Sequence, residues 1–244
     1  MQLNSRSIRR MMRTLTHKIF HKDPNIVFRI TEPQDKLKVI ELESFVFRKV
    51  LLNKLCKVSV ADHFEIMKDD VHKKDEHKIS TLAIEKQTQR VISGCRLEPY
   101  SDYFNPETLL TPQKNDPMIA QLISNLDSHW NDLFKAKGLE PNPSEFVYIK
   151  TGFTHDDYHG KGIFPGLWEY TEELLKSKGY KYVFSLMVSK PVQKVRIQKF
   201  GFEVLKDLPY AEMPVYGEFP FREIVAREPQ YKDERVLFGF KELK

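Results

Sequence analysis

Apolar and polar residues alternate in several short stretches of this chain, and such stretches predict strands. Two of them, 79–85 and 91–97, flank a polar turn at 87–89 and are expected to pair as a hairpin. A further short strand is expected directly after Phe202. The other expected strands are 26–31, 147–154, 180–188 and 235–241.

Apolar residues recur with helical spacing in the segments between these strands. In the segment 59–72, Ser59 is a suitable N-cap, and Val60, Phe64 and Met67 are expected to face the core. The expected helices are 33–50, 59–72, 117–137, 163–178 and 192–200, and the segment 209–220 is expected to be irregular. This order of elements predicts one α+β domain, residues 25–244, built around a central sheet.

The composition is that of a folded protein, with 41% hydrophobic and 12% aromatic residues in a chain of 244. No run of 18 apolar residues occurs, so we expect no transmembrane segment. The two cysteines, Cys56 and Cys95, cannot form a disulfide framework. This cysteine usage is typical of a reducing, intracellular compartment, and we expect a cytoplasmic protein.

The net charge of +5 comes from one end of the chain. Residues 1–22 hold six of the 39 basic residues and none of the 34 acidic ones, so the remainder is nearly neutral. A neutral body disfavours nucleic-acid binding. Residues 1–24 form a basic amphipathic tail, which is typical of mitochondrial targeting; a solvated tail or a helix that docks on a protein partner are the alternatives.

A glycine-bearing loop, 156–162 (DDYHGKG), joins the expected strand 147–154 to a helix that begins at Ile163. The first N–H groups of a helix have no partner within the helix, and the helix dipole adds positive potential at that end. The loop and the helix start therefore favour a phosphate or pyrophosphate site.

This order of strand, glycine loop, helix, strand and helix, with Gly162 and Gly201-Phe202 in register, resembles the GNAT superfamily of acyl-CoA-dependent N-acyltransferases. The resemblance covers about 26–244 and is strongest over 147–202. The segments 45–55 and 117–137 are similar to the arylalkylamine N-acetyltransferase-like branch. The resemblance implies a three-layer α+β fold, in which helices flank a central mixed, mostly antiparallel sheet.

The resemblance also implies an acyl-CoA cofactor, in the simplest case acetyl-CoA, and direct transfer to a small amine. The pantetheine arm would lie where the strands 147–154 and 180–188 splay apart, and the diphosphate would meet the loop. The residues implied to bind this group are Thr151, Gly152, Phe153, His159, Gly160, Lys161, Gly162, Ile163 and Phe164.

Two pairs of residues are candidates for catalysis. Ser185 and Ser189 match serines near the thioester in the arylalkylamine branch, although Ser189 is also the expected N-cap of the next helix. His155 and Asp156 could form an acid–base pair, since histidine titrates near neutral pH; the alternative is a polar loop that caps the helix. No third ligand accompanies His155 and His159, so we expect no metal site.

Several positions depart from the family pattern. His159 stands where Arg or Gln is usual, Phe164 replaces a small residue, and Pro165 has no N–H to offer. Val50 stands where relatives carry an acid, and Ile197 where many carry a tyrosine acid. These departures motivate an alternative function, a catalytically degenerate GNAT-like domain that serves as a structural or interaction subunit of a larger assembly.

The aromatic residues of the segment 209–220 and its border allow two interpretations. They could line an acceptor pocket, or they could pack this irregular segment onto the sheet, which is the more usual role of aromatic side chains. The residues concerned are Tyr210, Tyr216, Phe219 and Phe221.

Overall fold

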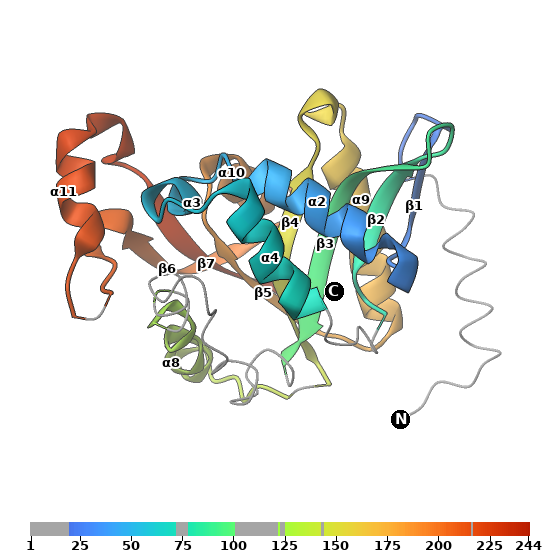
Figure 1. Ribbon diagram of the computed structural model, residues 1–244. Coiled ribbons are helices and arrows are strands. Elements are labelled where there is room, and N and C mark those ends of the chain that lie inside the picture. The colour runs from blue at the N-terminus through green and yellow to red at the C-terminus, as the bar shows by residue number, and fades with distance from the viewer. Residues whose placement is uncertain (1–19, 72–77, 101–121, 123–124, 143, 216) are drawn as a thin grey trace.

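A seven-stranded mixed sheet forms the centre of the molecule (Figure 1). The computed structural model describes residues 20–71, 78–100, 122, 125–142, 144–215 and 217–244. The strand order is β1-β2-β3-β4-β5-β7-β6, and all neighbours are antiparallel except β4 and β5. The strands are β1 (Ile26–Ile30), β2 (Thr81–Glu85), β3 (Arg90–Pro99), β4 (Phe146–Thr154), β5 (Tyr182–Met187), β6 (Glu203–Pro209) and β7 (Arg235–Glu242).

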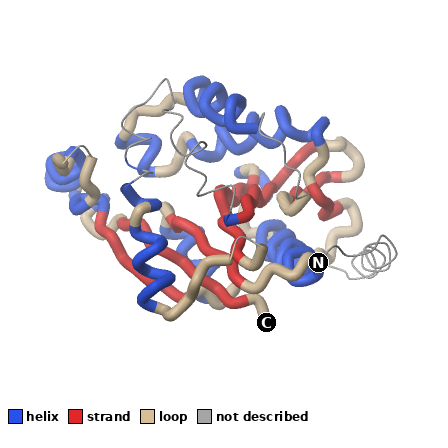
Figure 2. The backbone as a smooth tube through the Cα atoms, turned by 90° about the horizontal axis from the view of Figure 1, so that it is seen from below, coloured by secondary structure: helices blue, strands red, loops and turns tan. Residues whose placement is uncertain are grey.

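Helices lie on both sides of the sheet (Figure 2). The described α-helices are α2 (Lys36–Phe47), α3 (Leu51–Leu55), α4 (Val60–Val71), α8 (His129–Ala136), α9 (Ile163–Ser177), α10 (Lys190–Gln198) and α11 (Pro220–Arg227). The described 3-10 helices are η1 (Pro33–Asp35), η2 (Asp156–Tyr158), η3 (Tyr210–Glu212) and η4 (Pro229–Tyr231). Of these described helices, none combines the length and the apolar character needed to cross a membrane.

The alternation of side chains along β4 shows which helices cover which face. Phe153 packs with Val39 and Leu42 of α2, whereas its neighbour Gly152 lies against Phe164 of α9. Successive residues of a strand point to opposite faces. The helix α2, which packs on α4, therefore covers one face of the sheet, and α9 covers the other.

The largest core cluster is aromatic and joins α8 to the sheet. Trp130 and Phe134 are fully buried, and their rings both meet Phe184 of β5, with ring centres 4.9 and 5.2 Å away. The same cluster takes in Leu51 of α3 and Phe221 of α11. These two short helices are held in place by burying one apolar side each.

The structure confirms the expected fold class, and each expected strand is present with small differences at its ends. The expected helix 33–50 instead ends at Phe47, and α3 follows as a separate helix. The described part of 117–137 is interrupted by a turn at Ser128, and its first residues lie outside the described ranges. The segment 209–220 contains η3, and α11 begins at its end, which the sequence pattern did not predict.

The burial of the aromatic residues in and beside the segment 209–220 distinguishes the two interpretations of their role. Tyr210 and Phe221 are almost completely buried, which favours the packing interpretation for both. Phe219 is 40% exposed, and Tyr216 lies outside the described residues.

Met67 of α4 is buried as expected, but polar groups also lie where α4 packs on α2. Val60 is 40% exposed, so the expectation that it faces the core is wrong, and His63 takes the inward place. Its Nδ1 lies 3.0 Å from the hydroxyl of Ser44, and its ring packs on Phe47. Glu43, also buried, accepts a hydrogen bond of 3.0 Å from Arg96 of β3.

Burial lowers the pKa of His63. The charge of Glu43 raises this pKa and the charge of Arg96 lowers it, but both effects are smaller than that of burial. The folded protein therefore binds fewer protons near this site than the unfolded chain does. We predict that the contribution of His63 to the free energy of unfolding is complete above about pH 6.5 and decreases as the pH falls below that value. The substitution His63→Asn should make this decrease shallower. Urea unfolding at several pH values between about pH 5 and pH 8 measures how steeply the free energy of unfolding changes with pH.

His129→Asn is the matched comparison, because burial also lowers the pKa of His129 but that side chain is more exposed. It should remove a smaller part of the slope than His63→Asn does. An unchanged slope in His63→Asn would show that this histidine is not buried in its neutral form.

Candidate functional site

The strands β4 and β5 separate part-way along their length. They pair at three positions only, the last of which joins Tyr148 to Phe184. On its other side, β4 changes register with β3, so that Lys150 is the extra residue of a β-bulge. A bulge bends the strand that carries it. The bulge thus coincides with the point where β4 leaves β5, and we call this opening the fork.

The helix α9 begins beside the far end of β4 with several open amides. Gly160 and Gly162 have φ values of 76° and 75°, a conformation that favours glycine. Among the residues described, the amides of Gly160, Gly162, Ile163 and Phe164 donate to no acceptor. Pro165 follows and has no amide. Four open N–H groups at the start of a helix fit a phosphate group.

Side chains around the loop hold it against the sheet. The Nε2 of His159 donates to the carbonyl oxygen of Thr154 over 2.9 Å, which turns this ring back toward β4. Lys161 extends over the ring of Tyr158, whose hydroxyl donates to Glu85 over 2.8 Å. His21, from the segment before β1, donates to the carbonyl of Lys161 over 2.9 Å.

Asp156 and His155 are tied to the end of α2. The carboxylate of Asp156 receives Lys49 at 2.7 Å and Arg48 at 3.1 Å. The hydrogen bond from Lys49 is the main cause that lowers the pKa of Asp156, and burial opposes it only in part. His155 stacks on Phe45 with ring centres 5.7 Å apart. A carboxylate stabilised in this way is a weak base.

Ser185 lies at the fork, and Ser189 lies beyond the end of β5, at the start of α10. Ser185 donates to the carbonyl of Ile149 over 3.1 Å, at the point where β4 and β5 separate. Ser189 is the N-cap residue of α10, with no side-chain capping bond to the described residues. Ile149 precedes His155 by six residues, roughly 20 Å along a strand. The structure thus separates Ser185 from His155 and Asp156.

Two side chains fill the space beside β4 on the α9 face. A Cβ atom placed on Gly152 would lie 2.7 Å from the ring of Phe164 and 3.5 Å from the guanidinium of Arg196 in α10. Gly152 therefore lets both side chains approach the backbone. The open amides fit the diphosphate of an acyl-CoA, but a pantetheine arm beside Gly152 requires the half-buried Phe164 ring to turn aside.

The opposite face of the fork carries unsatisfied polar atoms that the sequence pattern did not reveal. Thr151 and Arg96 are cross-strand partners, so their side chains share the α2 face. The hydroxyl of Thr151 and the Oε1 of Glu43 are buried and have no hydrogen-bond partner within the described ranges. The sequence signal for Glu43 was its place among the apolar residues of α2, between Leu42 and Phe45.

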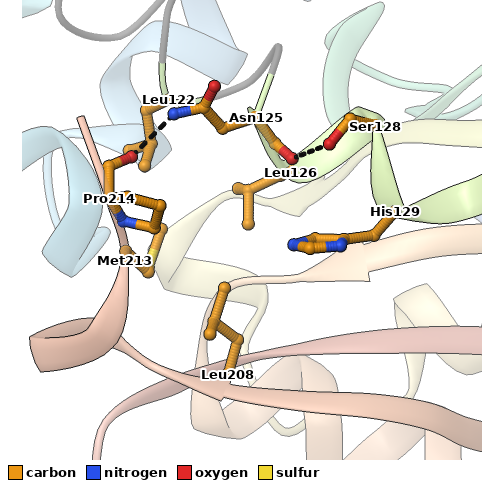
Figure 3. Close-up of a pocket in the computed structure, with 8 residues that line it drawn as sticks. All are labelled: Leu122, Asn125, Leu126, Ser128, His129, Leu208, Met213 and Pro214. Atoms are coloured by element: carbon orange, nitrogen blue, oxygen red, sulfur yellow. Dashed lines mark hydrogen bonds between the residues drawn. The ribbon is translucent and has the colours of Figure 1, made fainter. Parts of the chain in front are cut away.

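A hollow of about 230 Å³ lies between α8 and the end of β6 (Figure 3). Leu126, Leu208 and Met213 form apolar walls, and His129 lies on one side. Asn125 closes another side by donating to the carbonyl of Pro214 over 2.8 Å. This hollow is built from elements other than those of the fork.

Metal-binding side chains are dispersed in the described ranges, where no three His, Cys, Asp or Glu residues come together in a way that could hold an ion.

No protein-family model matches the sequence, and neither does any curated protein. Solved structures do match. The C-terminal condensation domain of Ebony, in complex with beta-alanyl-dopamine, superposes with a TM-score of 0.71 at 16% identity, over 89% of this chain and 98% of that one. Arylalkylamine N-acetyltransferase 2 from Aedes aegypti superposes with a TM-score of 0.64 at 16% identity, over 90% of this chain and 100% of that one.

The polyamine N-acetyltransferase of Drosophila melanogaster, which forms N-acetylagmatine, matches with a TM-score of 0.62 at 15% identity, over 89% of this chain and 100% of that one. At such identities the likeness establishes the fold. The chain has the GNAT fold, and its structural neighbours include arylalkylamine N-acetyltransferases.

Proposed function

We propose that this protein is an acyl-CoA-dependent N-acyltransferase that uses acetyl-CoA and acts on a small amine. The observation that carries the proposal is the fork, which opens at a β-bulge and leads along β4 to the four open amides at the start of α9. A strand edge and a helix start aligned in this way suit a ligand with an extended amide-containing arm and a diphosphate.

The chain's own residues would hold the ligand at two places. The amides of Gly160, Gly162, Ile163 and Phe164 would bind the diphosphate, and Lys161 would add positive charge nearby. The free edge of β4 from Thr151 to Phe153 would pair with the amide groups of the arm. When bound, the group supplies a thioester, which is an activated acyl donor.

The α2 face of the fork is where we expect the amine. Glu43 has one buried carboxylate oxygen in its ion pair with Arg96 and another that no described residue contacts through a hydrogen bond. That free oxygen can accept a proton from an amine, directly or through water. Ser185 at the fork and Ser189 at the start of α10 remain candidates, whereas His155 and Asp156 lie beside the loop before α9 and have other partners there.

The structural neighbours support an amine as the acceptor. The proteins themselves bind or act on amines or their amides: beta-alanyl-dopamine, arylalkylamines and agmatine. We extend to this chain only the chemistry that these compounds share, a primary amine on a short carbon chain.

The alternative, a structural or interaction subunit without catalysis, is favoured by one observation. Phe164 and Arg196 together fill the space over Gly152. If that packing were permanent, the arm could not enter. A partner that docks through the basic tail 1–24 belongs to this alternative, and the root of that tail contacts α9, where Phe20 meets Tyr170 at 5.4 Å between ring centres.

Titration with acetyl-CoA, followed by thermal unfolding, tests the proposed function. A ligand that binds only the folded state adds about 2.7 kcal/mol to the free energy of unfolding when its free concentration is 100 times its dissociation constant. We predict this stabilisation for the natural protein and a lower dissociation constant for Phe164→Ala, because the substitution clears the space over Gly152.

Phe219→Ala, which removes an exposed ring from the region of α11, is the control and should bind like the natural protein. If neither the natural protein nor Phe164→Ala were stabilised by any acyl-CoA, the alternative function would replace the enzyme. Weaker binding by Phe164→Ala would show that the ring contacts the ligand and does not obstruct it.

Glu43→Gln tests the base. We predict a loss of roughly 10²- to 10⁴-fold in kcat, with acetyl-CoA affinity unchanged, because Glu43 lies on the face opposite α9. Release of the free thiol measures the rate, with dopamine and agmatine as trial acceptors. Glu41→Gln, an exposed glutamate of the same helix, is the matched control. Equal rates for the two variants would remove Glu43 from the mechanism.

A further inference from the structure

Arg196 is a buried cation that has no counter-ion among the described residues. Its side chain extends from α10 and is only 3% exposed. One amino group, Nη1, donates to the hydroxyl of Ser185, while the Nε finds no hydrogen-bond partner in the described part of the chain. No carboxylate of the described residues forms an ion pair with it; Cys95 and Tyr148 are the titratable groups that act on it.

The surroundings of Arg196 are otherwise neutral. Burial raises the pKa of Cys95 to about 12, so this thiol of β3 carries no charge at pH 7. Burial lowers the pKa of Arg196 to about 10, and the guanidinium therefore stays charged at pH 7. Phe202 presents its ring 5.8 Å from the guanidinium carbon. A buried charge of this kind is unfavourable unless an anion joins it.

The position of Arg196 indicates where that anion would lie. Ser185, its hydrogen-bond partner, also donates to Ile149, so the guanidinium stands at the base of the fork. Its other amino group approaches Gly152 on the free edge of β4. An extended ligand that entered the fork from the start of α9 would end here with its reactive group.

The backbone fixes this arrangement. Gly201, with a φ of 70°, turns the chain after α10, and the amide of Phe202 donates to the carbonyl of Arg196 over 3.0 Å. Gln193, one turn earlier, donates to Met187 and Arg235 and anchors the helix to β5 and β7. Arg196 is therefore aimed at the fork by both ends of α10.

We propose that Arg196 is a catalytic residue of the acyltransferase, and that its guanidinium stabilises the negative charge that the leaving sulfur and the carbonyl oxygen acquire during transfer. This inference rests on the proposed function. Ile197 occupies the position where a tyrosine acid would protonate the sulfur, and an arginine cannot donate a proton at pH 7. Charge stabilisation by Arg196 takes the place of that proton transfer.

Atoms and electrons balance in this scheme. The amine nitrogen forms its bond to the carbonyl carbon with its own electron pair. The pair of the carbon–sulfur bond leaves on sulfur, whose charge the guanidinium meets. The proton lost by the amine passes to Glu43 and then to water, and the thiolate later takes a proton from water.

Calorimetric titration with CoA and with desulfo-CoA, which lacks the sulfur, measures this contact without catalysis. A thiol ordinarily ionises near about pH 8.5. We expect the natural protein to bind CoA more tightly than desulfo-CoA, and the difference to grow as the pH rises from 6.5 to 9. The ratio of the two dissociation constants should reach roughly tenfold, which is the effect of one charge-assisted hydrogen bond. Arg196→Met should abolish the preference, and Arg196→Lys should retain part of it.

One further variant and one further measurement separate the possible results. Lys194→Met removes an exposed charge from the same helix and should keep the preference. Arg196→Met without ligand should melt no lower than the natural protein, because an unpaired buried charge is gone; a lower melting temperature would assign Arg196 a structural role. Equal binding of CoA and desulfo-CoA at every pH would overturn the role of Arg196 and leave the proposed function intact. Binding of neither would overturn both.

Discussion

The separation of β4 from β5 is the constraint on which the rest of the site depends. Backbone groups that lose their partners inside a sheet must find others, because an unpaired buried carbonyl or amide is unfavourable. Side chains take over part of this task here: Ser185 donates to Ile149, Gln193 to Met187 and Tyr210 to Val188. With the bulge at Lys150, these contacts make the fork a built feature of the sheet.

The fork divides opposite charges between the two faces of the sheet. On the α9 face, Arg196 is a buried cation that lacks a counter-ion among the described residues. On the α2 face, Glu43 keeps one buried oxygen without a partner among the described residues. In the proposed reaction the amine loses a proton and the sulfur gains negative charge. Glu43 would accept the proton on one side of β4, and Arg196 would stabilise the negative charge on the other.

The sequence predicted what depends on local rules. Gly162 was identified from the glycine loop before a helix, and Gly201 from the resemblance to the GNAT superfamily; both occupy the left-handed conformation. The two buried charges escaped prediction, since burial of a charged side chain is decided by tertiary packing. A signal for Arg196 did exist: Gln193 and Arg196 lie three residues apart on one face of α10, and both are buried. On α4, Met67 is buried as expected, but His63 is buried where Val60 was expected to be.

Amide hydrogen exchange with and without acetyl-CoA tests the central claim most directly, because it reports on the backbone groups themselves. The claim is that the start of α9 binds the diphosphate and the free edge of β4 binds the arm. The account predicts slower exchange on binding at Gly160, Gly162, Ile163 and Phe164, with no change in α11. Unchanged exchange at these four amides in the presence of saturating acetyl-CoA would contradict it.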